Sequence, residues 1–445
     1  MKDIIKLSDH FTYRRLIRFT LPSIAIMIFT SIYGVVDGIF VSNYVGETSF
    51  ASLNLIMPYI MIFSAIGLMF GTGGSALVAM TLGMGDHDKA NDIFSLIIYT
   101  LMGIGAVFTV LGIILAKPAA VLLGADEKMI PYCVEYARVC FLGSVPFTLQ
   151  YAFQSFFITA QKPKLGLYVT VAAGMTNMLL DWLLVGVLRM GLTGAAAATV
   201  LSMLVGGVIP LFYFFRPNSS LLRLGKTRFL GKELFKAATN GASEFMSNIS
   251  MSIVNMLYNS RLMKYAGQSG VSAYGIIMYT NFIFIGIFFG YAMGVAPIVG
   301  YHYGAKNDRE LQNVFKRSLK MISIAAVIIT LISVMSARIF AVIFASGNMK
   351  LLEMTTMAIR IYSVSYLFAG FNLFGSSFFT ALNNGGVSAL ISFLRALLFQ
   401  VLFVLLLPAF LGITGIWLSI VCAEISAVVV TAICLVHNRK RYRYV

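Results

Sequence analysis

Long apolar runs separated by short polar segments cover almost the whole chain of 445 residues. About 20 helical residues, at ~1.5 Å each, cross a ~30 Å hydrocarbon core. The runs are continuous, unlike the alternating strands of a barrel, and a backbone in lipid must satisfy its own hydrogen bonds. The pattern predicts an all-α polytopic membrane protein with twelve transmembrane helices, near residues 15–40, 51–80, 92–115, 130–158, 166–188, 191–215, 233–260, 270–297, 313–335, 352–381, 387–409 and 413–436.

Short motifs recur at a nearly constant offset along the chain. A ladder of small residues recurs 219 positions apart: Gly67, Gly71 and Ser75, then Gly286, Gly290 and Gly294. Two further motifs recur 221 positions apart: Thr159-Ala160 with Thr380-Ala381, and Gly191-Leu192-Thr193-Gly194 with Gly412-Ile413-Thr414-Gly415. The ladders are typical of close helix packing. The offset predicts two related six-helix lobes.

The repeat also predicts the domain organisation. We expect a first lobe at residues 1–215, a polar cytoplasmic linker at 216–232, and a second lobe at 233–445 that ends in a basic cytoplasmic tail. Two related membrane lobes that rock about a central site are typical of a transporter. The alternative is a duplicated bundle with a purely structural role.

The net charge is +16, and the basic residues that produce it are distributed unevenly along the chain. With the N-terminus inside, 23 of the 33 Lys and Arg residues fall on the cytoplasmic side. This positive-inside bias predicts a multi-pass protein of the cell inner (plasma) membrane with both termini cytoplasmic. The basic tail at 438–443 is expected to meet anionic lipid headgroups, so nucleic acid is not an expected partner.

Other signals exclude several classes of protein. Gly225-Lys226-Thr227 resembles the end of a phosphate-binding loop, but Ser220 stands where that loop needs Gly, so we expect no ATP binding. The four Cys residues have no metal spacing and are read as packing residues without a disulfide. No cleavable signal is recognised at the N-terminus. We expect a monomer that is not an enzyme and has no cofactor.

Acidic residues within the apolar runs of the first half are the candidates for a functional site. A charged side chain at the bilayer centre costs ~2.5–3.5 kcal/mol of insertion free energy, so a function is expected where the sequence keeps one. Asp37 has Tyr33 four residues earlier on the same helical face, and Asp181 has Asn177 in the same relation. A hairpin turning near Met190 puts Asp181 and Thr199 at similar depth, about 13 Å from the turn. These oxygen donors suit a proton or Na⁺. The alternative for Asp37 is an interfacial residue at a helix end.

The offset partners of Asp37 and Asp181 are Met256 and Leu402, so this site is expected in the first lobe alone. The second half has other charges. Arg395 and Glu424 are expected to form a structural ion pair between neighbouring helices. Glu244 is a candidate for a substrate site or a second coupling site.

The chain resembles the MATE family, the multidrug and toxic compound extrusion transporters, through its twelve-helix duplication and residues Asp37, Asn177, Asp181 and Thr199. Two segments are similar to the MepA-like bacterial branch: Gly241-Ala242-Ser243-Glu244-Phe245-Met246 and Asn255-Met256-Leu257-Tyr258-Asn259. The resemblance implies two six-helix lobes and cation-coupled export of lipophilic, often cationic drugs without ATP.

The resemblance also implies roles for individual residues. The four residues named above match positions where related members bind Na⁺ or protons, so a Na⁺ site is implied there. Gln154 resembles a polar position facing the first-lobe cavity, and with Tyr33 and Glu244 it forms the expected substrate-binding set. The NorM-type pattern has acids in the middle of helix 7 and in helix 10, whereas here Glu244 is nearer the start of helix 7 and helix 10 offers only Glu353 near its outer end. This departure argues against a second-lobe Na⁺ site of that kind.

Three functions remain open from the sequence. The first is a multidrug efflux antiporter coupled to H⁺, Na⁺ or both, exporting drugs by alternating access and contributing to antibiotic resistance. The second is a flippase for lipids or lipid-linked oligosaccharides, which should carry several cations for pyrophosphate, whereas Arg395 is the one deep arginine. The third is a channel, for which no filter motif is seen.

Overall fold

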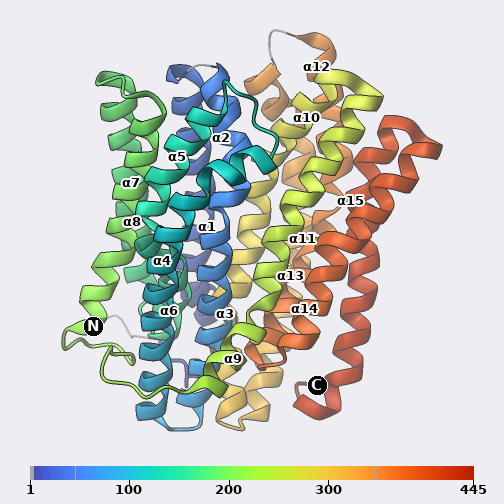
Figure 1. Cartoon of the computed structure of the whole chain (residues 1–445). Helices are drawn as coiled ribbons and strands as arrows, with labels where there is room; N and C mark the ends of the chain where they lie inside the picture. Colours follow the sequence, from blue (N-terminus) through green and yellow to red (C-terminus); the bar gives the residue numbers. More distant parts are fainter. Residues whose placement is uncertain (1–4, 46, 346–347) are drawn as a thin grey trace. The chain divides into compact units, whose positions relative to one another are not determined.

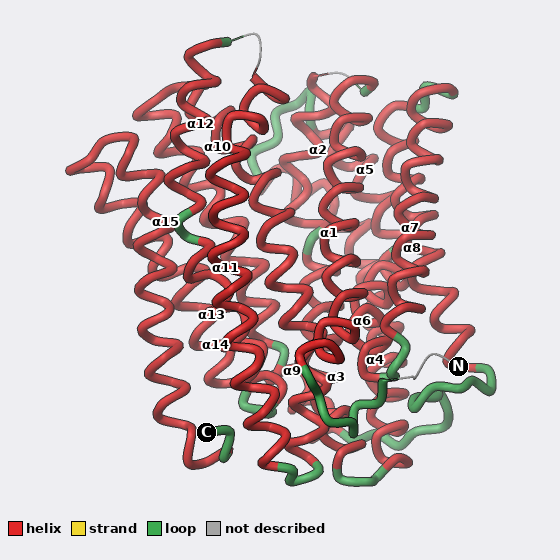
Figure 2. The backbone as a smooth tube through the Cα atoms, turned by 180° about the vertical axis from the view of Figure 1, so that it is seen from behind, coloured by secondary structure: helices red, strands yellow, loops and turns green. Residues whose placement is uncertain are grey.

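The structure is a computed structural model that describes residues 5–45, 47–345 and 348–445. Helices joined by short loops make up this described part, which contains no strand (Figure 2). Contacts between residues divide the chain into two compact units. We call residues 29–241 the N unit, and residues 1–28 together with 242–445 the C unit.

The N unit begins within the first helix (Figure 1). Its helices are the second part of α1 (Tyr13–Tyr44), α2 (Glu47–Ile60), α3 (Ile62–Gly83), α4 (His87–Leu122), α5 (Ile130–Leu142), α6 (Ser144–Thr159), α7 (Pro163–Leu180), the π-helix η1 (Asp181–Val187), α8 (Gly191–Phe215) and α9 (Gly231–Asn240). Asp86 caps α4 by accepting a hydrogen bond from the Lys89 amide, the residue type expected there.

The C unit holds both ends of the chain. Its helices are the first part of α1, α10 (Ala242–Gly304), α11 (Asp308–Ala345), α12 (Met349–Ser363), α13 (Tyr366–Ala381), α14 (Gly385–Phe393), the π-helix η2 (Leu394–Leu398) and α15 (Phe399–Tyr442). Asn348 caps α12 and Asn384 caps α14.

Two of the longest helices of the C unit are hairpins. Gly267 in α10 and Gly412 in α15 have φ of 61° and 58°, the left-handed region that glycine enters without strain. Tyr274 Oη donates to Asn255 Oδ1 at 2.8 Å, although 19 residues of straight helix would separate them by about 28 Å. Arg395 and Glu424 likewise meet across Gly412. The chain therefore reverses at both glycines.

These reversals bring the number of spans to the predicted value. Within the described residues, eight helical segments are long and apolar enough to cross a membrane, or nine with the pair α12 and α13, which is bent by 49°. Two of the eight contain the reversals at Gly267 and Gly412 and count twice. The consecutive helices α5 and α6 supply the remaining span, which gives twelve.

One predicted helix is divided in the structure. The helix expected at 233–260 is interrupted at Gly241, so α9 is separate from α10. A Cβ on Gly241 would lie 1.8 Å from the Met69 carbonyl oxygen, and one on Gly73 would lie 2.2 Å from the Ala237 carbonyl oxygen. The two glycines let the backbones of α3 and α9 touch, which the apolar pattern of the sequence does not reveal.

The segment before α9 is fastened along α4. Gly225 N donates to Ser95 Oγ at 3.1 Å, and Thr227 Oγ1 donates to the Asp92 carbonyl at 2.8 Å. Lys89 Nζ forms an ion pair with Glu233 Oε1 of α9 at 3.4 Å. The expected linker at 216–232 is therefore a docked part of the N unit.

The glycine ladders lie where helices touch, and each has a different partner. Gly67 and Gly71 face Thr148 and Ala152 of α6 in the N unit. In the C unit, Gly290 faces Ile24 of α1, where an added Cβ would lie 2.6 Å from the Ile24 Cα. The start of α1 therefore packs on the second half of α10, just as α9 packs on α3. This exchange explains why the compact units differ from the sequence halves.

We expect Gly73→Ala to destabilise the protein by about 1–3 kcal/mol, because the new methyl group would overlap backbone atoms that cannot rotate away. Thermal unfolding of the purified protein in detergent measures this as a lower Tm. The matched control is Gly103→Ala on α4, where a Cβ meets no atom within 4 Å. There Ala should raise the free energy of unfolding slightly, because the unfolded chain has less backbone entropy with Ala than with Gly. Equal Tm values for the two variants would contradict the packing described above.

Candidate functional site

Asp37 lies on the part of α1 that belongs to the N unit. Tyr33, one turn earlier, packs its ring 6.0 Å from that of Phe29, and both rings lie against Gly174 of α7. A Cβ on Gly174 would approach the Phe29 ring to 2.5 Å, so glycine makes room for this contact. Tyr33 is also within electrostatic range of Asp37 and of Tyr151 on α6. The structure thus brings Tyr33 and Asp37 together on the face of α1 turned to α7.

Asp181 is the first residue of the π-helix η1 and is fully buried. Asn177, on the preceding turn of α7, is 2% exposed. A π-helical turn replaces i→i−4 hydrogen bonds by i→i−5 bonds and widens the helix, and such turns are frequent at functional sites. The widened turn carries the acidic side chain.

The carboxyl groups of Asp37 and Asp181 lie close enough to interact directly. Four side-chain oxygens here are buried and accept no hydrogen bond from any described residue: Asp37 Oδ1, Asp181 Oδ1, Asp181 Oδ2 and Asn177 Oδ1. No ion pair among the described residues involves either acid. This is an acidic pair in a buried place without a basic partner.

Tyr136 of α5 is a member of this site that sequence reasoning missed. Its side chain is 3% exposed, and it is within electrostatic range of both Asp37 and Asp181 and of the Cys140 thiol. Tyr136 lies 45 residues before Asp181 in a helix rich in aromatic residues. No local pattern distinguishes it from a core tyrosine.

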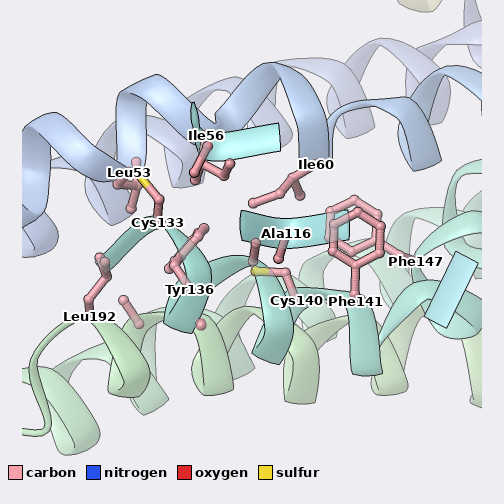
Figure 3. Close-up of a cluster of buried hydrophobic side chains, with 14 of the residues drawn as sticks. Leu53, Ile56, Ile60, Ala116, Cys133, Tyr136, Cys140, Phe141, Phe147 and Leu192 are labelled. Carbon is pink, nitrogen blue, oxygen red and sulfur yellow. The ribbon is translucent and has the colours of Figure 1, made fainter. Parts of the chain in front are cut away.

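Tyr136 belongs to a cluster of buried apolar side chains in the N unit (Figure 3). Figure 3 shows Tyr136 and Cys140 among side chains that include Leu53, Ile56 and Leu192. Val185 of η1 belongs to the same cluster, so the π-helix is anchored in it.

Among the described residues, no hydrogen bond or ion pair joins Thr199 or Gln154 to the acids. Thr199 is half-buried on α8, and its backbone carbonyl accepts from Ser202 Oγ. Gln154 is buried on α6 and lines a cavity of about 10 Å³ with Gln150 and Thr170. The expected hydroxyl donor at Thr199 and the substrate contact at Gln154 stay predictions.

Arg395 and Glu424 of the C unit form the ion pair that the sequence suggests. Arg395 Nε donates to both carboxylate oxygens at 2.9 and 3.0 Å, and Nη2 lies 2.8 Å from Oε1. Asn372 Nδ2 donates to Glu424 Oε2 at 2.7 Å, and Thr431 Oγ1 donates to Asn372 Oδ1. This carboxylate has a bidentate cationic partner and an amide donor, unlike Asp181.

Glu244 also lies in the C unit, near the start of α10, where its side chain is partly buried. It interacts electrostatically with Arg395. No side chain of the described residues donates a hydrogen bond to it. Glu244 is therefore a second acid near a guanidinium that Glu424 already holds.

The donor set at the acidic pair fits a hard monovalent cation or a proton. Carboxylate and amide oxygens are preferred by hard cations. Within the ranges the structure describes, no three residues of the His, Cys, Asp and Glu types come together as a site for a metal ion. Two carboxyl groups with one amide are a small, oxygen-only set.

A family model named MatE matches residues 22–183 and again residues 245–406. The chain belongs to the MatE family. The two matches start 223 positions apart, close to the offsets of the sequence motifs, which supports the predicted duplication.

Relatives of this MatE protein extend over nearly its whole length. It is 23% identical over 421 residues to the multidrug export protein MepA of Staphylococcus haemolyticus, which covers 93% of this chain and 90% of the relative. A crystal structure of MATE in complex with MaL6 has a TM-score of 0.94 at 21% identity, with all of both chains covered. An outward-facing multidrug resistance MATE family transporter of the MOP superfamily has a TM-score of 0.92 at 22% identity, covering 100% of this chain and 99% of that one. The predicted MATE-type fold is confirmed.

We expect Glu424→Gln to destabilise this MatE protein by up to about 3–5 kcal/mol, because the mostly buried Arg395 guanidinium loses its ion pair and keeps the weaker electrostatic interaction with Glu244. The double variant Arg395→Met/Glu424→Met removes both charges, and most of the stability should return. Denaturation of the single and double variants in detergent measures the coupling between the two residues. Strictly additive losses would show that the pair has no energetic coupling.

Proposed function

We propose that this MatE protein is a multidrug efflux antiporter, in which Asp37 and Asp181 of the N unit bind the coupling cation. One observation carries the proposal: the fully buried carboxyl group of Asp181 interacts with the partly buried one of Asp37, and no described basic side chain forms an ion pair with either. Its similarity to a multidrug export protein and to a multidrug resistance transporter supports multidrug export as the activity.

Charge in a region of low dielectric constant explains why such a pair is a coupling site. Two ionised carboxylates in contact repel strongly, so at least one must be neutralised by a proton or by a bound cation. Asp37, Asp181 and Asn177 would hold a Na⁺ ion, with Thr199 as a further donor. H⁺ and Na⁺ would then compete for the same oxygens.

Coupling requires that the ion discriminates between two conformations. A ligand shifts such an equilibrium only by the difference in its affinity for the two states. The carboxyl pair supplies that difference if its two carboxyl groups move apart or become hydrated in one state. The ion then favours the conformation in which the carboxyl groups are close and dry.

The substrate class follows from the same charges. A lipophilic cation is attracted to the carboxylates of Asp37 and Asp181 and to aromatic faces, and within the N unit we assign its contacts to Tyr33 and Gln154. Glu244 of the C unit is a separate candidate contact. Binding of the coupling ion removes the charge that attracts the drug. The ion and the drug therefore exclude each other, as exchange requires.

Orientation and energy source complete the proposal. The positive-inside bias places both termini in the cytoplasm and the protein in the plasma membrane, and transport uses an ion gradient without ATP. A flippase for lipid pyrophosphates is not favoured, because the Arg395 guanidinium that would bind the pyrophosphate is held by Glu424.

We expect Asp37→Asn and Asp181→Asn each to reduce gradient-driven export of a fluorescent lipophilic cation from proteoliposomes at least tenfold, because each removes an ion-binding oxygen. An imposed proton gradient and an imposed Na⁺ gradient, tested separately, identify the coupling ion. Asp88→Asn is the matched control, since Asp88 is an exposed acid in the first turn of α4. Export at the wild-type rate by both the Asp37→Asn and the Asp181→Asn variants would contradict the proposal.

Two carboxyl groups also predict the stoichiometry. At zero membrane potential, one pH unit supplies ~1.4 kcal/mol for each proton. Exchange of one proton can hold a drug gradient of about tenfold, and exchange of two protons about a hundredfold. For proton coupling we expect a gradient near a hundredfold in potential-clamped vesicles. Asp181→Asn should lower any residual gradient to tenfold or less. A wild-type limit of tenfold would mean that only one proton is exchanged.

A further inference from the structure

A groove lies between α12 and the C-terminal part of α11 in the C unit. Its volume is about 420 Å³, within the range of ~300–1,000 Å³ typical of small-molecule sites. It is lined by Arg338 of α11 and, from α12, by Met349, Leu352, Glu353, Thr356, Met357, Arg360 and Ile361. Ser333 and Ser363 hydroxyls meet at 2.6 Å below it and hold the two helices together.

The described segments near both chain ends, at Phe11 and Arg443, lie at the other end of the C unit. Phe11 N donates to Glu310 at the start of α11, and Gln312 donates to the Arg443 carbonyl. From Glu310 to Arg338, α11 rises about 42 Å, which exceeds the hydrocarbon thickness of a bilayer. Figure 1 likewise shows α12 far from the C-terminus within this unit. With cytoplasmic termini, the groove opens at the external membrane interface.

Three charged side chains line the groove, and all three are exposed: Arg338, Glu353 and Arg360. Glu353 and Arg360 are seven residues apart, so they lie on one face of α12. None of the three forms an ion pair with a described residue. Two guanidinium groups and one carboxylate thus line the same groove and leave one positive charge in excess.

Apolar side chains continue from the groove along α11. Ile332, Met335, Ile339 and Ile343 follow one another at intervals of three or four residues and are each more than half exposed. This spacing places them on one helical face. Met349 and Met357 on α12 are also more than half exposed and extend the apolar surface into the groove itself. An occupant with a charged head and an apolar tail fits both parts.

We propose that this groove binds the headgroup of a phospholipid that carries a primary ammonium group, as in phosphatidylethanolamine. Arg338 and Arg360 donate hydrogen bonds to the phosphate oxygens, since guanidinium groups suit phosphate geometry. The ammonium group donates to the Glu353 carboxylate. The acyl chains lie along the exposed apolar face of α11. No step of this assignment depends on the coupling ion or on the transported drug.

The test is binding of dioctanoyl phosphatidylethanolamine to the purified full chain in neutral detergent, measured by microscale thermophoresis. We expect Arg338→Gln/Arg360→Gln to weaken binding about 30-fold, or about fivefold for each charge lost. Lys264→Gln is the matched control, an exposed basic residue near the break at Gly267 that does not line the groove. Unchanged affinity in the double variant would overturn the assignment.

Three further ligands separate the parts of the proposal. Dioctanoyl glycerol lacks the phosphate and should bind weakly; equal binding would reduce the site to an apolar surface and refute it. O-phosphoethanolamine lacks the chains, and equal binding of this soluble headgroup would refute a lipid occupant. Glu353→Gln should weaken the phosphatidylethanolamine complex while leaving dioctanoyl phosphatidylglycerol unchanged or tighter. A parallel change for both lipids would refute the ammonium contact. Unfolding temperatures within 2 °C of wild type, roughly 1 kcal/mol or less, show that the variants are folded.

Discussion

Hydrocarbon does not solvate charge, and the two units of this protein meet that constraint in opposite ways. In the C unit, Glu424 is balanced by a bidentate contact with Arg395 and by Asn372, so burial of these charges is compensated within the protein. In the N unit, Asp181 is fully buried, and neither of its carboxylate oxygens accepts a hydrogen bond from the described residues. Under the proposed function, its balance comes from a proton or a cation that can arrive and leave.

The backbone obeys the same constraint through helices that pack without gaps. Gly73 and Gly241 bring α3 and α9 into backbone contact, and Gly290 does the same for α10 and α1. The first helix of each sequence half therefore starts on the second helix of the other half. Since these contacts would not tolerate a methyl group, each helix start is fixed to its partner. Any motion of a unit must carry the exchanged segment with it.

Much of the fold could be predicted from the sequence because its signals are local or periodic. The lengths of the apolar runs predicted the membrane spans. The recurrence of motifs about 220 residues apart predicted the duplication. The partnership of Arg395 with Glu424 followed from charge and helix order. Three features could not be predicted. The π-helix at Asp181 depends on a shift of one residue in backbone hydrogen bonding, Tyr136 reaches the acids only through tertiary packing, and the division at Gly241 depends on the close approach of Met69.

Each of the two π-helices in the described residues carries an ionisable side chain, Asp181 in η1 and Arg395 in η2. A π-helical turn costs stability and persists where the surroundings compensate for it. For η2 the compensation is visible in the ion pair with Glu424. For η1 the structure shows part of the compensation in the packing of Val185. The Asp181 carboxylate has no hydrogen-bond partner among the described residues. Under the proposed function, ion binding supplies the missing part, so the local stability of η1 depends on the coupling ion. The π-helical turn that positions Asp181 is then also the element whose conformational free energy changes when the ion binds.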